Sequence, residues 1–387
     1  MPHVTALIAE YDPLHQGHFR HLSWLRGQTE VLLVVLGGVF SQRGEPALLH
    51  PLTRAHMALL AGADLVVALP APFCFSQAGL FARGAVALAQ ALGADGISFG
   101  SECDDSDLLG RASFILAQET TAFKVKLREA LEAGASYASA QAAALTACDP
   151  SFEGLLSQPN SALALAYLAE GFKRGWHPHV LPLHRPSGDH HGSLSATALR
   201  CALRSGADPT SLALAPSSFA PLDEALAQGC FTPDINALWP VLHHQLLTAP
   251  LADIESLYGE GLGVKAQSLA CELTGAAGGF EDLIEGLTSK RHPRSRLRRA
   301  SIALYLGMSL QEWRHAEAQG PEEILLLGAN GRGRAHLAKV KKESPLPLHS
   351  RPFAQRSKLA QKSEWLWESL TARPDATRLK KRKPILI

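Results

Sequence analysis

The chain has 387 residues, of which 46% are hydrophobic and 19% charged, so it can bury a sizeable core and form two or more domains. It has no apolar run of the roughly 18 residues that a membrane helix needs and no signal-peptide pattern at its start, which favours a globular cytoplasmic protein. Its net charge of +1 divides into −3 over residues 1–205, −7 over residues 206–280 and +11 over residues 281–387, and this predicts a polyanion-binding surface near the end of the chain.

The first 205 residues alternate short apolar runs with helical patterns. The apolar runs predict strands at 4–9, 31–36, 65–69, 96–99 and 180–183. The helical patterns predict helices at 18–25, 53–61 and 78–92, with further helices inserted at about 103–175. Strands recurring about every 30 residues with helices between them predict a Rossmann-like, doubly wound α/β domain with a parallel sheet over residues 1–205.

The remaining part, residues 206–387, forms a second, mainly helical and basic region. The helical pattern continues to about residue 320. A short strand is then predicted at 323–328, a turn at 330–333 and a basic helix at 335–342, and we expect the basic tail at 378–383 to be mobile.

The residues after the first predicted strand have phosphate-binding chemistry. They read Glu10-Tyr-Asp-Pro-Leu-His15-Gln-Gly-His18, and a helix is predicted to begin at or just after His18. Ligands of an open α/β sheet lie beyond the carboxyl ends of the strands, where a helix N-terminus offers N–H groups to an anion. We therefore predict that His15 and His18 bind a phosphate chain and that Gly17 lets the backbone approach it. The alternative is a pair of ordinary surface histidines in a turn.

A second helix start follows the last predicted strand of the domain. It reads Ser195-Ala-Thr197-Ala-Leu-Arg200. Ser195 and Thr197 have the hydroxyls that commonly cap a helix. The Arg200 guanidinium, one turn further on, can bind β- and γ-phosphate oxygens as pyrophosphate leaves.

The cysteines and histidines show no metal-binding pattern. The six cysteines lie far apart without a C-x-x-C pair, and the adjacent pairs His190-His191 and His243-His244 lack the i, i+4 spacing of ligands on a helix. We expect no metal site formed by protein side chains.

The combination of H-x-G-H with a Ser/Thr-x-x-Arg helix start resembles the nucleotidyltransferase superfamily that includes cytidylyltransferases, pantetheine-phosphate adenylyltransferase and class I aminoacyl-tRNA synthetases. More closely, the chain resembles the bacterial tRNA(Met) cytidine acetate ligases. The matching blocks span nearly the whole chain in the family's order. They are 9–18, Gln42-Arg-Gly-Glu-Pro-Ala47, Gly62-Ala-Asp-Leu-Val66, Phe99-Gly-Ser-Glu102, Gln158-Pro-Asn160, Ser195-Ala-Thr-Ala-Leu-Arg200 and Pro293-Arg-Ser-Arg-Leu-Arg-Arg299.

This resemblance implies an ATP-dependent ligase that forms acetyl-adenylate and acetylates the wobble cytidine of elongator tRNA(Met) at N4. ATP is then the activating substrate, acetate and tRNA are the other partners, and Mg²⁺ accompanies the ATP phosphates. We expect His15, His18, Arg200, Arg43 and Glu45 to be catalytic. The expected ATP-binding residues are Ile8, Ala9, Glu10, Tyr11, Asp12, Pro13, Leu14, His15, Gln16, Gly17, His18, Phe19, Arg20, His21, Gly100, Asn160, Arg185, Ser195 and Thr197.

Arg43 and Glu45 follow the second strand, and the alternative for them is a structural ion pair in a tight loop. The basic cluster is the expected tRNA-binding surface, and the alternative for it is pairing with the acidic region 206–280. The cluster consists of Lys290, Arg291, Arg294, Arg296, Arg298 and Arg299. Because the surplus of +11 exceeds the −7 of that region, we favour RNA.

The chain departs from the family pattern at several positions. They are Asp12, Val39, His50, Pro51, Ala68 and Ser161. These departures weaken the inference of acetate and cytidine more than that of ATP. A small-molecule adenylyl- or cytidylyltransferase and a catalytically silent RNA-binding relative therefore stay as alternatives, and the sequence leaves the oligomeric state open.

Overall fold

The computed structural model describes residues 1–185, 195–273, 278–350 and 357–387. An eight-stranded sheet in the order β5-β4-β1-β2-β3-β6-β7 forms its centre, and β8 also pairs with β6. The strands are β1 Val4–Ala9, β2 Val31–Gly37, β3 Leu65–Leu69, β4 Gly96–Ser101, β5 His179–His184, β6 Ile324–Ala329, β7 Leu348–His349 and β8 Ile385–Leu386. The strands from β5 to β3 are parallel, whereas β6 runs antiparallel to β3. The predicted doubly wound α/β fold is confirmed, within a mixed sheet.

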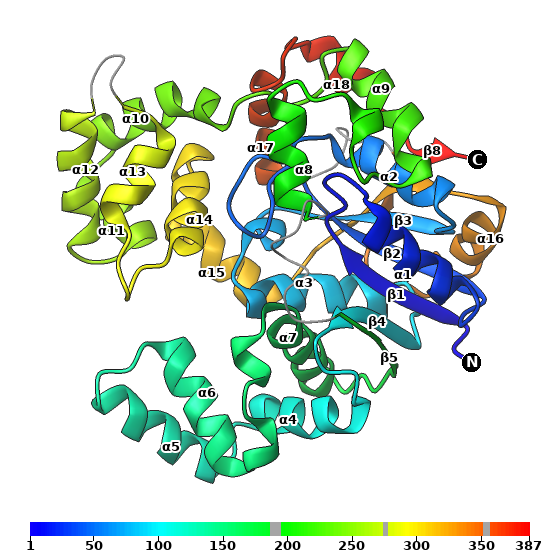
Figure 1. Ribbon diagram of the computed structural model, residues 1–387, viewed down its shortest axis with the longest axis horizontal. Helices are drawn as coiled ribbons and strands as arrows, with labels where there is room; N and C mark the ends of the chain where they lie inside the picture. Colours follow the sequence, from blue (N-terminus) through cyan, green and yellow to red (C-terminus); the bar gives the residue numbers. More distant parts are fainter. Residues whose placement is uncertain (186–194, 274–277, 351–356) are drawn as a thin grey trace.

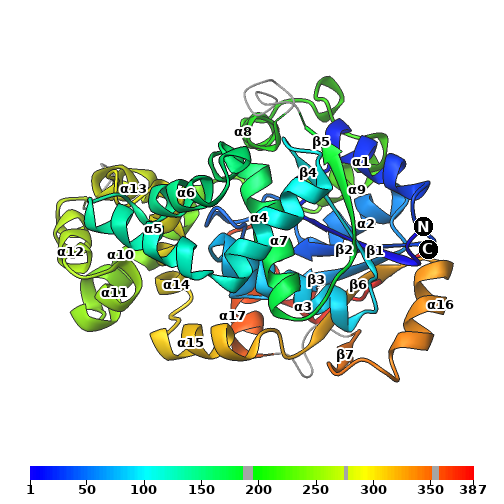
Figure 2. The ribbon, with the colours of Figure 1, turned by 90° about the horizontal axis from the view of Figure 1, so that it is seen from below.

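Helices cover both faces of the sheet, as the apolar runs of the strands require. In β2, Val31, Leu33 and Val35 belong to one apolar cluster, while Leu32, Val34 and Leu36 belong to another. The first cluster includes residues of α3 Ala78–Ala91 and α7 Pro159–Lys173, and the second includes residues of α1 Gln16–Arg26 and α2 Pro51–Leu60. Helices α1 and α3 therefore lie on opposite sides of the strands (Figure 2).

The predicted helical insertion lies between β4 and β5. It consists of α4 Ser106–Gln118, α5 Thr121–Glu132, α6 Tyr137–Cys148 and then α7. Helix α7 packs on α3 and on β4, whereas α5 and α6 pack on each other and project away from the sheet (Figure 1).

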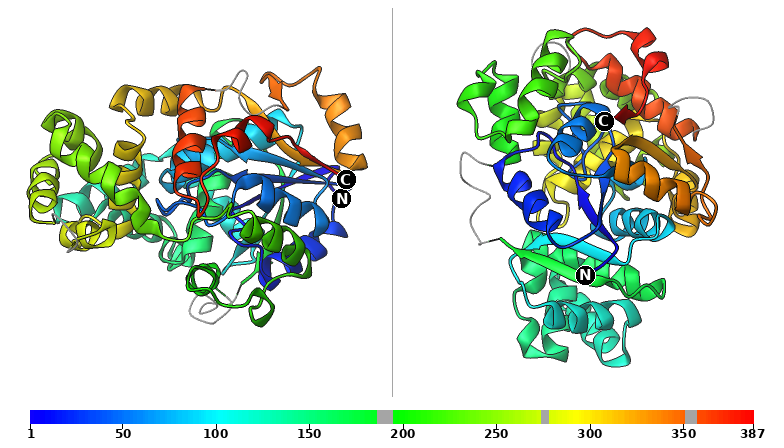
Figure 3. Two further views of the ribbon diagram at one scale, coloured as in Figure 1. Left: turned by 90° about the horizontal axis from the view of Figure 1, so that it is seen from above. Right: turned by 90° about the vertical axis from the view of Figure 1, so that its right-hand side faces the viewer.

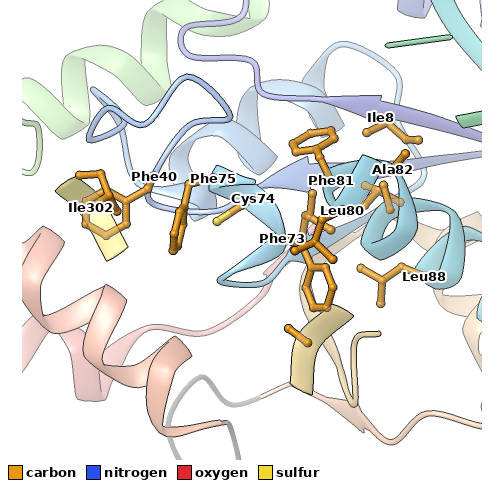
Figure 4. Close-up of a cluster of buried hydrophobic side chains, with 14 of the residues drawn as sticks. Ile8, Phe40, Phe73, Cys74, Phe75, Leu80, Phe81, Ala82, Leu88 and Ile302 are labelled. Atoms are coloured by element: carbon orange, nitrogen blue, oxygen red, sulfur yellow. The ribbon is translucent and has the colours of Figure 1, made fainter. Parts of the chain in front are cut away.

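A second group of helices follows α8 Ala196–Arg204 and α9 Phe219–Ala227. Its members are α10 Trp239–Thr248, α11 Leu251–Tyr258, α12 Leu262–Glu272, α13 Phe280–Leu287, α14 Arg294–Tyr305 and α15 Leu310–Gln319. Helices α10 to α14 pack together beside the sheet domain (Figure 1). Ile302 of α14 lies in the same apolar cluster as Phe40, Phe75 and Ile8 (Figure 4), so one core joins this group to the sheet.

The end of the chain is more ordered than the sequence suggests. The residues predicted as a turn begin α16 Gly331–Val340, and the Asn330 side chain accepts a hydrogen bond from the Gly333 amide at 3.0 Å. Helices α17 Lys358–Ser369 and α18 Ala376–Lys381 follow. Figure 3 shows this segment in red running over the N-terminal part of the chain before β8 pairs with β6.

The prediction of a mobile tail at 378–383 is wrong. Leu379 is buried in α18, and the buried Arg382 forms ion pairs with Glu364 at 3.1 Å and Glu368 at 2.5 Å. The count of basic residues hid the fact that α17 supplies acidic partners. In the described part of the chain, the helices are too short or too polar to cross a membrane.

Candidate active site

The largest concentration of predicted site residues lies where the strand order reverses. From β1 the sheet continues to β2 and β3 on one side and to β4 and β5 on the other, which places a ligand-binding crevice beyond the carboxyl ends of β1 and β4. Two cavities of about 470 Å³ and 820 Å³ lie there and share part of their lining. The shared residues are Ile8, Ala9, Glu10, Tyr11, His15, His18, Asn160, Leu163, Tyr167 and Arg185.

The turn from β1 into α1 holds the two motif histidines against each other. His15 is the N-cap of α1, and its Nδ1 accepts a hydrogen bond from the Gly17 amide at 3.0 Å. The His18 Nδ1 accepts one from the His15 amide at 3.4 Å, and the two rings stack with centroids 3.7 Å apart. Because a backbone amide only donates, both Nδ1 atoms are unprotonated and each neutral ring carries its hydrogen on Nε2. The pair therefore supplies two N–H donors.

These histidines are neutral donors rather than charges. Burial, together with the nearby Arg185 guanidinium, lowers the pKa of His15 to about 4. Burial and then the neighbouring His15 lower the pKa of His18 well below its ordinary value. Positive charge in the site is therefore supplied by arginines, while the histidines give directional hydrogen bonds of the kind that orient a phosphate chain.

Arg200 brings one of these charges to the larger cavity. Ser195 is the N-cap of α8, with its Oγ accepting from the Ala198 amide at 3.2 Å, and this places Arg200 one turn inside the helix. The buried Arg200 guanidinium donates to the Asp12 carbonyl oxygen at 3.0 Å and to the Thr197 hydroxyl at 3.2 Å. Arg200, Ser195 and Thr197 all line the cavity, so the two predicted motifs meet.

Gly100, Arg185 and Asn160 come together on the other side, beyond β4 and β5. A Cβ at Gly100 would lie 2.5 Å from the Arg185 Cδ, so glycine allows the arginine to cross the end of β4. Asn160 is fixed at the start of α7 by Glu102, whose Oε1 accepts from the Asn160 Nδ2 at 2.8 Å. Glu102 also accepts from the Ser161 amide and hydroxyl, both at 2.8 Å.

The pKa of Glu102 reflects this position. Partial burial opposes its ionisation, but the hydrogen bonds from Ser161 and Asn160 outweigh it and hold the pKa below the usual value. Glu102 thus stays a carboxylate that orients Asn160. It lies in a block used for the family resemblance, yet sequence reasoning gave it no role.

Arg54 is a second residue that sequence reasoning missed. This fully buried side chain of α2 donates to the carbonyl oxygens of Leu49 at 3.0 Å and of Glu10 and Gly38. It thereby joins the loops that follow β1 and β2. A lone arginine inside an apolar helical pattern was the available signal, because a buried guanidinium needs several acceptors.

Most residues of the stretch 8–21 line a cavity, and three do not. Pro13, Leu14 and Phe19 do not contribute to either lining, and Leu14 is fully buried in the apolar cluster that contains α1. The cavity-lining members are Ile8, Ala9, Glu10, Tyr11, Asp12, His15, Gln16, Gly17, His18, Arg20 and His21. The Tyr11 backbone is left-handed, with φ of +49°, a strained conformation of the kind found at functional turns.

The departures from the family pattern lie mostly outside the cavities. Val39 and Ala68 are buried in the apolar clusters, His50 contacts Glu364 at 2.7 Å, and Pro51 begins α2. Ser161 is buried against Glu102, and none of these five lines either cavity. Asp12 does line the larger one, but its carboxylate accepts from the amides of residues 48 and 49.

The loop after β2 contacts both the cavity and the C-terminal helices. The exposed Arg43 lines the larger cavity, with its Nη1 3.4 Å from the Thr197 hydroxyl. Glu45 does not line it, but its Oε2 lies 3.7 Å from the Arg200 Nη2, and its Oε1 accepts from Arg298 of α14.

The predicted basic cluster divides into engaged and exposed side chains. Arg294 and Arg298 both bind Glu281 at 2.7 Å, Arg296 donates to the Tyr258 carbonyl oxygen at 3.2 Å, and Arg299 donates to the Gln42 carbonyl oxygen at 3.2 Å. The exposed members are Lys290 and Arg291. Regional net charge could not separate these groups, because their partners Glu281 and Glu285 belong to the basic region 281–387 and not to the acidic region 206–280.

Among the described residues, no group of three or more His, Cys, Asp or Glu side chains is placed to hold a metal ion. The His190-His191 pair lies outside the described residues. His243 of the other pair is 2.8 Å from the Ala270 carbonyl oxygen.

Comparisons with known proteins found similar sequences and similar structures. A family model described as HIGH Nucleotidyl Transferase matches residues 2–380. Proteins named tRNA(Met) cytidine acetate ligase from Halalkalibacterium halodurans and Lactiplantibacillus plantarum are 31% and 33% identical to this chain over 90% of its length, and 87% and 88% of theirs is covered. Crystal structures of Thermotoga maritima TmcAL, apo and bound with alpha-thio ATP, match with a TM-score of 0.87 at 25% identity, covering 100% of this chain and 99% of theirs.

Proposed function

We propose a function for this chain from the premise that it belongs to the HIGH nucleotidyl transferases and, within them, to the tRNA(Met) cytidine acetate ligases. It is an ATP-dependent ligase that joins acetate to AMP and transfers the acetyl group to N4 of the wobble cytidine of elongator tRNA(Met). The observation that supports this most directly is the stacked His15–His18 pair, which presents two Nε2–H donors beside Arg185 and Arg200 at the end of β1.

The first step is an in-line displacement. A carboxylate oxygen of acetate attacks the α-phosphorus of ATP, the bond to the β-phosphate oxygen breaks, and pyrophosphate leaves. His15 and His18 orient the phosphates through hydrogen bonds, while Arg200 and Arg185 neutralise the charge that develops on the leaving group. In the second step the cytidine N4 attacks the acetyl carbonyl carbon, AMP departs, and N4 loses a proton.

The cavities are large enough for this substrate. Their volumes of about 470 Å³ and 820 Å³ fall in the usual range for small-molecule sites. Phe99, Leu163 and Tyr167 give the smaller one an apolar wall, which suits a nucleoside. We assign the nucleoside to that cavity, and the phosphates and acetate to the side lined by Arg200.

Magnesium enters this proposal as a companion of ATP rather than as a resident ion. Mg²⁺ is commonly held by substrate phosphates and only one or two carboxylates. Glu10 lines both cavities, with its Oε1 accepting from the Gln42 amide at 2.7 Å. Burial raises the pKa of Glu10, so a bound cation would have to keep this group ionised. Glu10 is the residue that we propose for contact with Mg²⁺.

The tRNA is proposed to lie across the C-terminal helices. Lys290 and Arg291 are exposed just before α14, and Arg294 is partly exposed within it. Cations at the surface give salt-dependent contacts with phosphates. Because the other four arginines of the cluster, Arg294, Arg296, Arg298 and Arg299, are held by protein groups, we assign the RNA contacts to Lys290 and Arg291.

Acetate-dependent exchange of pyrophosphate into ATP tests the enzyme assignment. The wild type should exchange only with acetate present, and His18→Ala should reduce the rate by about 100-fold or more, the usual cost of removing a donor that stabilises a transition state. An unchanged rate in that variant would remove the histidine pair from the site. Exchange with a phosphorylated metabolite instead of acetate would identify a small-molecule transferase.

A further inference from the structure

Three charged side chains from distant parts of the sequence meet beside the larger cavity. Arg200 belongs to α8, Glu45 to the loop after β2, and Arg298 to α14 of the C-terminal region. The Glu45 Oε1 accepts a hydrogen bond from Arg298, and its Oε2 is 3.7 Å from the Arg200 Nη2. One carboxylate therefore lies between an arginine of the cavity wall and an arginine from outside the sheet domain.

The two contacts of Glu45 are unequal. Its hydrogen bond goes to Arg298, because 3.7 Å to Arg200 is longer than a hydrogen bond allows. Among the described residues, Arg200 donates its hydrogen bonds to neutral oxygens, the Asp12 carbonyl and the Thr197 hydroxyl. A buried guanidinium bound mainly by neutral acceptors keeps its charge available for an anion.

Arg298 is held firmly in this position. Its Nη2 donates to both carboxylate oxygens of Glu281, at 2.8 and 2.7 Å. The α14 backbone also lies directly on the loop, since a Cβ at Gly44 would be 2.5 Å from the Arg299 amide nitrogen. One turn further along α14, Ile302 packs in the apolar cluster that contains Phe40 (Figure 4). The position of Arg298 is therefore fixed by Glu281 of its own region and by the packing of α14 on the loop after β2.

We propose that Arg298 is a positioning residue for adenylation: by neutralising Glu45, it leaves Arg200 free to bind the triphosphate. The C-terminal helices thereby complete the ATP site without touching ATP. Without Arg298, the Glu45 carboxylate, which already lies within ion-pair distance of Arg200, would pair with it more closely and would repel the phosphates. This inference rests on the proposed function, in which Arg200 binds the phosphates of ATP.

Binding of a non-hydrolysable ATP analogue, measured by calorimetry, tests this relation. Arg298→Met should raise the Kd by about tenfold or more, as expected when one partner of a largely buried charge pair is lost. Glu45→Gln alone should bind at least as tightly as the wild type. The double variant R298M/E45Q should return the Kd to within about threefold of the wild type, because Arg298 acts only through Glu45.

Arg314→Met is the matched control, since this exposed arginine lies on α15 of the same region and forms no hydrogen bond or ion pair with the loop within the described part of the chain. Its Kd should not change. A double variant that binds as weakly as R298M overturns the proposal, because a general packing defect is not repaired by removing a second charge. A wild-type Kd in R298M overturns it as well.

This measurement is independent of the acetate chemistry. If the wild type shows no acetate-dependent exchange but E45Q restores binding to R298M, the proposed ligase function fails and the role of Arg298 stands. If the wild type exchanges pyrophosphate but E45Q restores nothing, the role of Arg298 fails and the ligase function stands.

Discussion

Replacing Gly44 by alanine should uncouple α14 from the loop after β2. Gly44 has a φ of +77°, and an alanine Cβ there would lie 2.5 Å from the Arg299 amide nitrogen and 2.6 Å from the Arg298 carbonyl carbon. The left-handed backbone costs alanine about 1–2 kcal/mol, and forcing the extra carbon against packed backbone costs about 1–3 kcal/mol more. We expect G44A to lower the free energy of unfolding by about 2–5 kcal/mol, the sum of these two costs.

Urea denaturation followed by circular dichroism measures this change. Gly261→Ala is the matched control, because Gly261 has a φ of +74° and no atom within 4 Å of the added Cβ. It should lose only the backbone share of about 1–2 kcal/mol. In G44A, the displaced Glu45 should also weaken ATP binding. If G44A is no less stable than G261A and binds ATP like the wild type, the close contact between α14 and the loop does not exist.

Three further predictions concern stability, nucleotide binding and RNA. Burial, and then Arg185, lower the pKa of His21 to about 4, so the unfolded chain takes up a proton first as the pH falls below 6.5. Between pH 7.5 and 5, the wild type should therefore lose about 2 kcal/mol more unfolding free energy than His21→Asn; equal losses would mean that His21 titrates normally. Glu102→Gln should raise the KM for ATP about tenfold through Asn160 with a smaller effect on kcat, as the loss of charged hydrogen bonds implies; an unchanged KM would show that Asn160 does not contact nucleotide. Lys290→Ala with Arg291→Ala should weaken tRNA binding and reduce the slope of log affinity against log salt by about 2, one per lost phosphate contact; an unchanged slope in filter binding would place the tRNA elsewhere.

The sheet and the phosphate site could be predicted because local patterns determine them. The run 31–37 is apolar at every side-chain-bearing position, as expected of a central parallel strand covered on both faces. Ligands of such a sheet lie beyond the carboxyl ends of its strands, so the position of His15 and His18 directly after the first strand already indicated their surroundings. The meeting of Arg200 with this turn followed from the family resemblance and from the same topology.

Contacts between distant segments could not be predicted in this way. The partners of Arg298 and Arg382 are carboxylates on other elements, Glu45 and Glu364 among them. The periodicity of one segment does not indicate which residues of another segment it contacts. The prediction from regional net charge failed for the same reason. It counts cations without showing which of them are already neutralised, and the tail at 378–383 looked mobile on that basis alone.

The antiparallel pairing of β6 with β3 has a consequence for synthesis of the chain on the ribosome. β3 consists of Leu65–Leu69, all apolar, and its outer hydrogen-bonding edge is covered only when residues 324–329 arrive. More than 250 residues must be translated between the two strands. The nascent sheet therefore emerges with an unpaired edge that can pair with strands of other chains. The order of translation thus leaves this edge unpaired until β6 has been made, and truncation before β6 would leave it permanently open.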